Sequence, residues 1–268
     1  MIRSLYSGVS GMKSHQTKLD VIANNVANVN TTAYKTATVT FEDTISQTIK
    51  NASASSDEST GSNPSQVGIG SRVAGISSTF TQGTPQYTGR PLDMAIQGNG
   101  FFVVEDINGK RYLTRDGSFK FDNEGYLVNQ QGFRVLDEDG DTIQIDDPIT
   151  TINVSKQGQL TALDEAGEVI DQVNIGIAFI TNPESLYKEG GNLYTMSEST
   201  MPDDIDDAID MAGTEGRGTI EANSLEMSNV DLSDEFANMI VTQRGYQANV
   251  RVISVSDQML EELINLKR

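Results

Sequence analysis

The chain has 268 residues, of which 38 are acidic and 19 basic, giving a formal net charge of −19. A surface of this sign repels nucleic acid and anionic membranes. The sequence has no cysteine, no tryptophan and a single histidine, which excludes disulfides, thiolate metal sites and cysteine nucleophiles and argues against histidine-clustered metal sites and most catalytic triads.

The first 30 residues are predicted to form an amphipathic helix. Apolar residues recur three and four positions apart, the heptad pattern of a helix–helix seam with one polar member. The seam positions are Ile2, Leu5, Val9, Met12, Gln16, Leu19, Ala23 and Val26. The asparagines that follow predict the end of this helix, at Asn24, Asn25, Asn28 and Asn30. The segment lacks the apolar core of a cleaved secretory leader, and no stretch of the chain approaches the roughly 18 apolar residues that a membrane span needs.

The middle of the chain is predicted to be rich in β-strands. Residues 51–66 are Ser-rich and are expected to form a flexible loop or linker. Short β-type runs follow, and those at 101–105 and 111–114 flank an Ile-Asn-Gly turn, which is a strong hairpin signal. We expect a twisted antiparallel sheet, sandwich-like or partly closed. The acidic stretch 197–218 is expected to be an exposed loop.

Residues 229–268 are predicted to form a second, longer helix. Asp231 is the expected N-cap, and Asp234 and Glu235 suit the positive end of the helix dipole. About 35 residues make a rod of roughly 50 Å. Its seam positions are Leu232, Phe236, Met239, Gln243, Tyr246, Val250, Ile253, Asp257, Leu260 and Ile264. Paired seams at opposite chain ends favour a two-helix arm over two helices that each pack on the central domain.

Polar residues interrupt both seams, at Gln16, Gln243 and Asp257. A buried polar position in such a seam costs stability but can fix the register and the number of partners. Such interruptions are therefore another reason to interpret the seams as contacts between helices rather than as a simple domain core.

The charge is unevenly distributed along the chain. Residues 1–50 have a net charge of +2 and residues 229–268 of −2, whereas residues 51–228 carry −19. Charge near zero permits close association, and a large charge of one sign opposes it. We therefore expect the ends to pack against protein and the middle to face water.

Candidate chemical sites are weak. Asp137, Asp139 and Asp141 resemble the start of a calcium loop, but the glycine and the acid that an EF-hand needs further on are missing, so a hairpin turn explains them better. His15 is interpreted as an exposed helix residue, and the aromatic residues at 101, 102, 119, 121 and 126 as sheet core. No catalytic residue, metal site or cofactor is expected. A pair of acidic residues that would hydrolyse glycosides is kept as an alternative.

Four blocks of sequence carry a family resemblance. Residues 19–35 resemble the N-terminal signature of flagellar rod and hook axial proteins, and residues 67–104 look like the central block of that family. Residues 114–132 are similar to its next β block, and residues 235–268 resemble its closing helix. The blocks occur in the family's order and cover most of the chain.

The resemblance implies a structural subunit of the bacterial flagellar hook, in a short form, that self-assembles into a helical tube and transmits torque from rod to filament. It also implies export by the flagellar type III apparatus without a cleaved signal peptide, and contacts with adjacent axial and junction proteins, but none with nucleic acid and no membrane insertion. A distal rod subunit of the basal body is the alternative. A secreted carbohydrate hydrolase on a β scaffold and a monomeric adhesin or binding module are the alternatives from other classes.

The expected fold is α+β, with long terminal helices in a coiled-coil-like arm and a central antiparallel β-rich domain. Residues 1–30 and 229–268 are expected to form a helical inner-core domain, 31–75 and 211–228 connecting segments, and 76–210 a β-rich outer domain. The assembly interface is expected to comprise Leu5, Val9, Met12, Leu19, Val26, Asn24, Asn25, Asn28, Phe236, Met239, Tyr246, Val250, Ile253, Leu260 and Ile264.

Overall fold

A computed structural model of the chain describes residues 2–52, 61–145, 151–164, 169–197, 205, 208–214 and 216–266. The chain divides into two compact units, each assembled from segments distant in sequence. The first, here called the helical unit, consists of Met1–Ala27, Ala37–Ser78 and Asp231–Arg268. The second, the β unit, consists of Asn28–Thr36 and Thr79–Val230. The α+β class expected from the sequence is confirmed.

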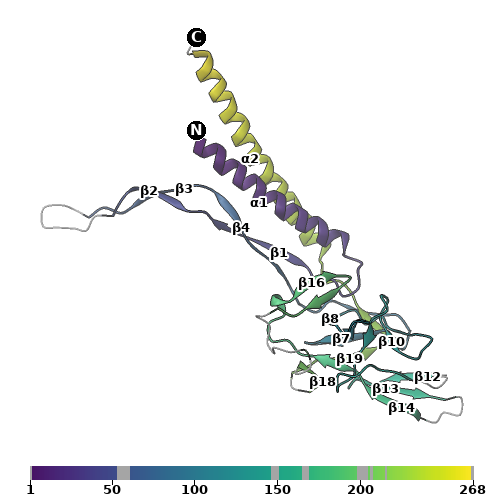
Figure 1. Cartoon of the computed structure of the whole chain (residues 1–268). Helices are drawn as coiled ribbons and strands as arrows, with labels where there is room; N and C mark the ends of the chain where they lie inside the picture. The colour runs from purple at the N-terminus through teal and green to yellow at the C-terminus, as the bar shows by residue number, and fades with distance from the viewer. Residues whose placement is uncertain are drawn as a thin grey trace. The chain divides into compact units, whose positions relative to one another are not determined.

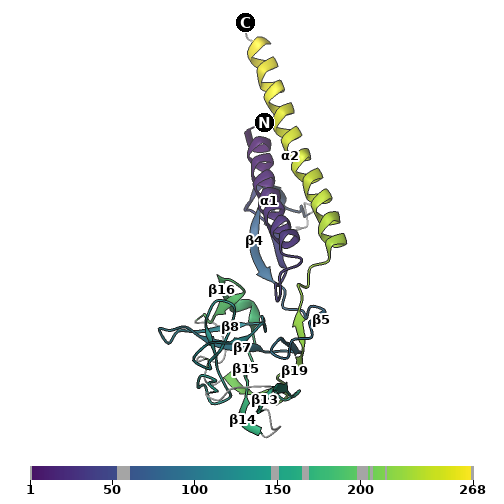
Figure 2. The same ribbon diagram turned by 90° about the vertical axis from the view of Figure 1, so that its right-hand side faces the viewer.

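Two helices form the core of the helical unit. Helix α1 spans Ile2–Ala27 and helix α2 spans Leu232–Leu266, and they lie against each other in antiparallel directions (Figures 1 and 2). Asp231 caps α2 as predicted, because its carboxylate accepts a hydrogen bond from the Ser233 N–H at 2.8 Å and its carbonyl accepts one from the Glu235 N–H at 3.0 Å. Neither of these helices is apolar enough over a sufficient length to cross a membrane.

Four strands of the helical unit form two-stranded antiparallel ribbons that the sequence interpretation did not predict. Strand β1 (Ala37–Asp43) pairs with β4 (Ser71–Ser78), and β2 (Ser46–Lys50) pairs with β3 (Ser65–Gly68) (Figure 1). The predicted Ser-rich linker lies between β2 and β3, but its end belongs to β3 and its residues 53–60 lie outside the described ones.

The β unit is built on an antiparallel sheet in which nine strands can be assigned among the described residues. The predicted hairpin is confirmed, since β7 (Phe101–Glu105) pairs with β8 (Arg111–Thr114) around a turn in which Gly109 has a φ of +78°. The other strands are β9 (Lys120–Phe121), β10 (Leu127–Val128), β11 (Arg134–Val135), β15 (Gly176–Ala178), β16 (Tyr187–Gly190), β17 (Leu193–Thr195) and β18 (Ile209–Met211).

Smaller sheets surround this one. Three strands form an antiparallel sheet: β12 (Thr151–Val154), β13 (Gln159–Leu163) and β14 (Val169–Asn174). Two further pairs are β6 (Met94–Gln97) with β19 (Thr219–Ala222), and β5 (Pro85–Tyr87) with β20 (Ser224–Glu226). A short 3-10 helix spans Pro183–Ser185. Through these two pairs, the last strands of the β unit, β19 and β20, lie beside two of its first strands, β6 and β5.

Strand β7 lies between two apolar cores. Phe102 and Val104 point into one core with Met94, Phe119 and other residues, whereas Phe101 and Val103 point into a second core on the opposite face. Alternate residues of a strand face opposite sides of its sheet, so a continuous apolar run is what a strand covered on both faces requires. The first core also includes Leu160 and Ala162 of β13, so the three-stranded sheet packs on this core as well.

Part of the acidic stretch 197–218 differs from its prediction as an exposed loop. Ala208 and Ile209 are 2% and 8% exposed, and β18 pairs with β15. In the sequence, the surrounding acidic residues make the short apolar run Ala208-Ile209 easy to overlook. This run forms part of the second core. Residues 198–204, 206–207 and 215 of this stretch lie outside the described ones.

The interpretation of Asp137, Asp139 and Asp141 as a turn is confirmed. One oxygen of the Asp137 carboxylate accepts hydrogen bonds from the N–H groups of Asp139 and Asp141, at 3.1 and 2.8 Å, and Gly140 has a φ of +85°. The carboxylate that a calcium loop would turn toward a cation is used by the backbone of its own turn. Among the described residues no cluster of His, Cys, Asp and Glu is arranged to hold a metal ion.

Candidate assembly interface

Glycines bring α1 and α2 close together within the helical unit. A methyl group on Gly8 would lie 3.3 Å from the Ile253 side chain, and one on Gly11 would lie 2.9 Å from the amide of Asn249. Gly8 itself is buried. The intramolecular contact therefore includes small residues of α1 that lie outside the apolar seam identified from the sequence periodicity.

His15 packs into the space that a glycine of α2 leaves in this contact, so its prediction as an exposed residue is wrong. A methyl group on Gly245 of α2 would lie 2.6 Å from the His15 ring, and the ring also meets Phe41 of β1 edge to face at 5.6 Å. The buried Nδ1 of His15 has no hydrogen-bond partner among the described residues. Burial, together with the nearby Lys18 ammonium, lowers the pKa of His15 below 6.5, so the ring packs as a neutral, largely apolar group near neutral pH.

The contact between His15 and Gly245 predicts that Gly245→Ala has opposite effects on stability in the presence and in the absence of the His15 ring. Gly245→Ala alone should destabilise the helical unit, because overpacking costs about 1–3 kcal/mol and exceeds the gain of about 1 kcal/mol from replacing a helical glycine by alanine. In a His15→Ala background the same change should stabilise, since the notch is then empty. Thermal unfolding followed by helical circular dichroism tests this, and destabilisation by Gly245→Ala in both backgrounds would contradict the contact.

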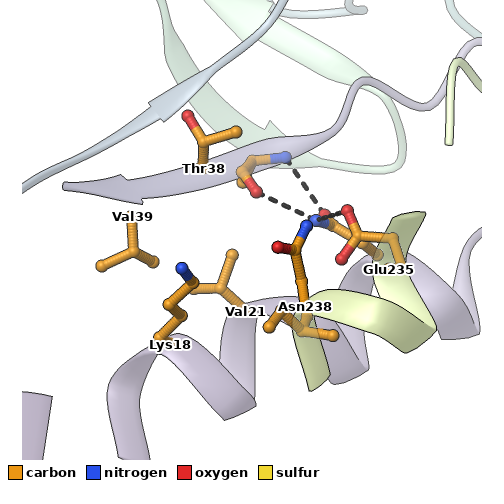
Figure 3. Close-up of a pocket in the computed structure, with 9 residues that line it drawn as sticks. Lys18, Val21, Thr38, Val39, Glu235 and Asn238 are labelled. Atoms are coloured by element: carbon orange, nitrogen blue, oxygen red, sulfur yellow. Dashed lines mark hydrogen bonds between the residues drawn. The ribbon is translucent and has the colours of Figure 1, made fainter. Parts of the chain in front are cut away.

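Asn25 ties three elements of the helical unit together. Its amide nitrogen donates hydrogen bonds to the Ala37 carbonyl at 2.9 Å and to the Glu235 carboxylate at 3.0 Å, and its oxygen accepts one from the Ala37 N–H at 3.1 Å (Figure 3). The side chain is 1% exposed. Asn25 thus pairs with Ala37 as a strand neighbour would, and it has an intramolecular role that the sequence interpretation did not foresee.

A pocket of about 100 Å³ lies beside this amide (Figure 3). Helix α1, strand β1 and the first turns of α2 each form one side of it. Its apolar walls are valine and isoleucine side chains, and its polar groups come from both helices. The lining residues are Lys18, Val21, Ile22, Asn25, Ala37, Thr38, Val39, Glu235 and Asn238.

The predicted interface residues differ in how much of them the chain itself covers. Three on α2 are strongly exposed: Phe236 at 49%, Val250 at 40% and Ile264 at 67%. Asn24 is also exposed, and Asn28 is half-buried and accepts a hydrogen bond from the Thr31 hydroxyl at 3.0 Å. The remaining predicted apolar residues are half-buried: Leu5, Val9, Met12, Leu19, Val26, Met239, Tyr246, Ile253 and Leu260.

Helix α2 exposes more apolar surface than its seam contains. The exposed large apolar residues of α2 are Leu232, Phe236, Ile240, Val241, Val250, Val252, Val255, Met259, Leu263, Ile264 and Leu266. Conversely, the polar seam positions Gln16, Gln243 and Asp257 are exposed, so they are not buried within the chain. Large exposed apolar patches are typical of surfaces that contact another protein.

The β unit contains a buried charge cluster that sequence reasoning missed. The Glu226 carboxylate accepts hydrogen bonds from the Lys35 ammonium at 2.6 Å, the Gly83 N–H at 2.8 Å and the Arg115 guanidinium at 3.4 Å. The three charged side chains are between 0% and 4% exposed. Lys35 also donates to the Thr81 carbonyl at 2.8 Å, so the cluster joins the segments at residues 35, 81–83, 115 and 226.

Burial dominates the electrostatics of this cluster. It lowers the pKa of Lys35 and of Arg115, and the Glu226 carboxylate opposes both shifts. Burial likewise raises the pKa of Tyr194, which neighbours the cluster, to about 12. The Tyr194 hydroxyl has no hydrogen-bond partner among the described residues. The arrangement holds together chain segments that are distant in sequence.

Three family models match the chain. The model described as "Flagella basal body rod protein" matches residues 5–35, "Flagellar hook protein FlgE/F/G D1 domain" matches residues 95–162, and "Flagellar basal body rod FlgEFG protein C-terminal" matches residues 221–266. The flagellar basal-body rod protein FlgG of Bacillus subtilis (strain 168) is 45% identical over 268 residues, covering 100% of both chains. The chain belongs to the flagellar hook and basal-body rod protein family.

Hook proteins of this family are also similar to the chain, over different extents. The flagellar hook protein FlgE of Borreliella burgdorferi is 28% identical in an alignment of 443 residues that covers both chains fully. FlgE of Treponema pallidum is 52% identical over 136 residues, which are 50% of this chain and 29% of that protein. Members of the family are structural proteins, and the chain is accordingly not an enzyme, which removes the hydrolase alternative.

The first and third family segments contain most of α1 and all of α2, and the second contains β7 and β8. Each of them also contributes one member of the buried charge cluster: Lys35 ends the first segment, Arg115 lies in the second and Glu226 in the third. The sequence interpretation quoted the first two within its family blocks, at residues 19–35 and 114–132, without a role. Both lie in mostly polar stretches, TTAYKTATVT and YLTRDGSFK, so no local pattern marked them.

Proposed function

We propose that the chain is a distal rod subunit of the flagellar basal body that assembles with copies of itself into a helical tube. The observation that carries the proposal is the similarity to a basal-body rod protein over the whole of both chains. The sequence interpretation favoured a short hook protein, with the distal rod as its alternative. The distal rod is favoured because the hook protein that aligns over the whole chain has a lower identity to it. The hook protein with the higher identity aligns with only half of the chain.

Exposed apolar surface on α2 supports self-assembly through the helical unit. In the assembled tube, α1 and α2 would act as a coiled-coil-like arm that buries its apolar residues against neighbouring copies. Burial of apolar surface contributes roughly 25 cal/mol per Å² before the ordering costs of association. A contact between two different surfaces, repeated without closure, produces a helical filament rather than a closed ring.

The charge distribution supports an arrangement from the centre of the tube outward. Residues 1–30 and 229–268 would form the inner core, because their charges nearly balance, and the acidic residues 76–210 would form the outer domain. Of the two segments expected to connect these parts, most of 31–75 belongs to the helical unit and 211–228 belongs to the β unit. The neighbours of such a subunit are further copies and adjacent axial proteins, and delivery would use the type III export apparatus without a cleaved leader.

Electron microscopy of the purified chain at high salt tests this function, since salt screens the net charge that opposes assembly. We expect straight, stiff tubes. Readily curved tubes would favour the hook function instead, and compact single particles at every concentration and salt level would overturn self-assembly.

A further inference from the structure

The helical unit carries an uncovered apolar end and, far from it on the same helix pair, a pocket. Gly8 of α1 lies against Ile253 of α2, so the antiparallel register places the start of α1 level with about residue 259. Residues 261–266, here called the α2 tail, therefore extend beyond α1 (Figures 1 and 2). Its apolar residues Leu263, Ile264 and Leu266 are 50%, 67% and 82% exposed.

The pocket lies at the opposite end of the pair, beside Glu235 and Asn238 in the first turns of α2 (Figure 3). The 28 residues between Glu235 and Leu263 span about 42 Å of helix. The α2 tail therefore cannot reach the pocket of its own chain.

The pocket and the α2 tail are complementary in chemistry. The apolar walls of the pocket, at Val21, Ile22 and Val39, suit a branched aliphatic side chain such as those of the tail. Two charged side chains line the pocket: Glu235 accepts a hydrogen bond from Asn25, whereas Lys18 forms no ion pair with the described residues. The tail carries the exposed carboxylates of Glu261 and Glu262, which can pair with Lys18.

We propose that the α2 tail of one copy inserts into the α1–β1–α2 pocket of the next copy. The inference rests on the proposed function, because it names the partner surface for self-assembly. A pocket and a projection at opposite ends of one elongated unit make a head-to-tail contact, which is open and repeats along the direction of the helices. Leu263 or Ile264 fills the pocket, and Lys18 pairs with the tail carboxylates.

The absence of cysteine from the chain makes cross-linking a direct test. Val39→Cys and Leu263→Cys variants are prepared separately, assembled as a mixture and treated with a short bis-maleimide. The mixture should give covalent dimers, each variant alone should give none, and the double variant should give a ladder of multimers. The matched control replaces Leu263→Cys by Ser254→Cys, an exposed position of α2 about 13 Å away along the helix, and should give none.

Charge reversal tests the ion pair independently. Lys18→Glu alone and Glu261→Lys/Glu262→Lys alone should each raise the critical concentration for assembly about tenfold, and the combination should restore it to within about twofold. Tubes that form from the cysteine mixture without cross-links above the Ser254→Cys control would overturn the inference alone. A wild-type chain that never assembles would overturn the proposed function, and the inference with it.

Discussion

Glu226→Ala is expected to lower the free energy of unfolding of the β unit by about 3–5 kcal/mol, the range found when one partner of a buried ion pair is removed. The Lys35 ammonium and the Arg115 guanidinium would stay buried without the carboxylate that they share. Urea unfolding followed by tyrosine fluorescence measures the loss. The pKa of Lys35, already lowered by burial, should fall further in the variant, because the opposing effect of Glu226 is gone.

Two further comparisons test whether the loss of stability comes from the unbalanced buried charge. Glu221→Ala removes an exposed carboxylate from β19 and should change the stability by less than about 0.5 kcal/mol. Lys35→Met combined with Glu226→Gln should be less destabilised than Glu226→Gln alone, because one unbalanced charge is then absent. A Glu226→Ala variant as stable as the Glu221→Ala variant would show that the cluster does not support the β unit.

The buried charge cluster shows what sequence reasoning could not reach. Lys35 and Glu226 are 191 positions apart, and neither belongs to a local pattern that requires a partner. Local chemistry did predict the Asp231 cap, the β7–β8 hairpin and the Asp137 turn, because each is determined by residues within about a dozen positions. The β1–β4 ribbon was missed although Val39 and Phe41 alternate with polar residues, since seven residues in a polar context are a weak strand signal.

Periodicity likewise identified the apolar residues of the helices but not their partners. The pattern of the first helix pointed to Leu5, Val9 and Met12, and it gave no sign that Gly8, Gly11 and His15 of α1 also lie close to α2. A glycine lowers the helix propensity of a sequence, so it is usually interpreted as evidence against a helix. Its role in allowing two helices to approach closely can be recognised only when the facing helix is known. The apolar residues of α2 that stay exposed, such as Phe236 and Ile264, are then available to other copies.

Phe236→Asp combined with Ile264→Asp is expected to abolish tube formation while both units stay folded. The two side chains are 49% and 67% exposed, so their replacement should cost the single chain less than about 0.5 kcal/mol each. In the tube, each change removes apolar burial and places a charge in a desolvated contact. A combined loss of about 3 kcal/mol per contact corresponds to a more than hundredfold rise in the concentration needed for assembly.

Sedimentation and electron microscopy measure assembly, and circular dichroism checks the fold. The matched control, Gln247→Asp combined with Gln258→Asp, adds the same charge at exposed polar positions of α2 and should assemble at nearly the wild-type concentration. Ile253→Asp is a different experiment, since Ile253 is half-buried against Gly8 and its replacement should loosen α1 from α2 as well. Normal tubes from the Phe236→Asp/Ile264→Asp variant would exclude the exposed apolar surface of α2 as the assembly contact. Equal loss of assembly in the control would assign the effect to net charge instead of apolar burial.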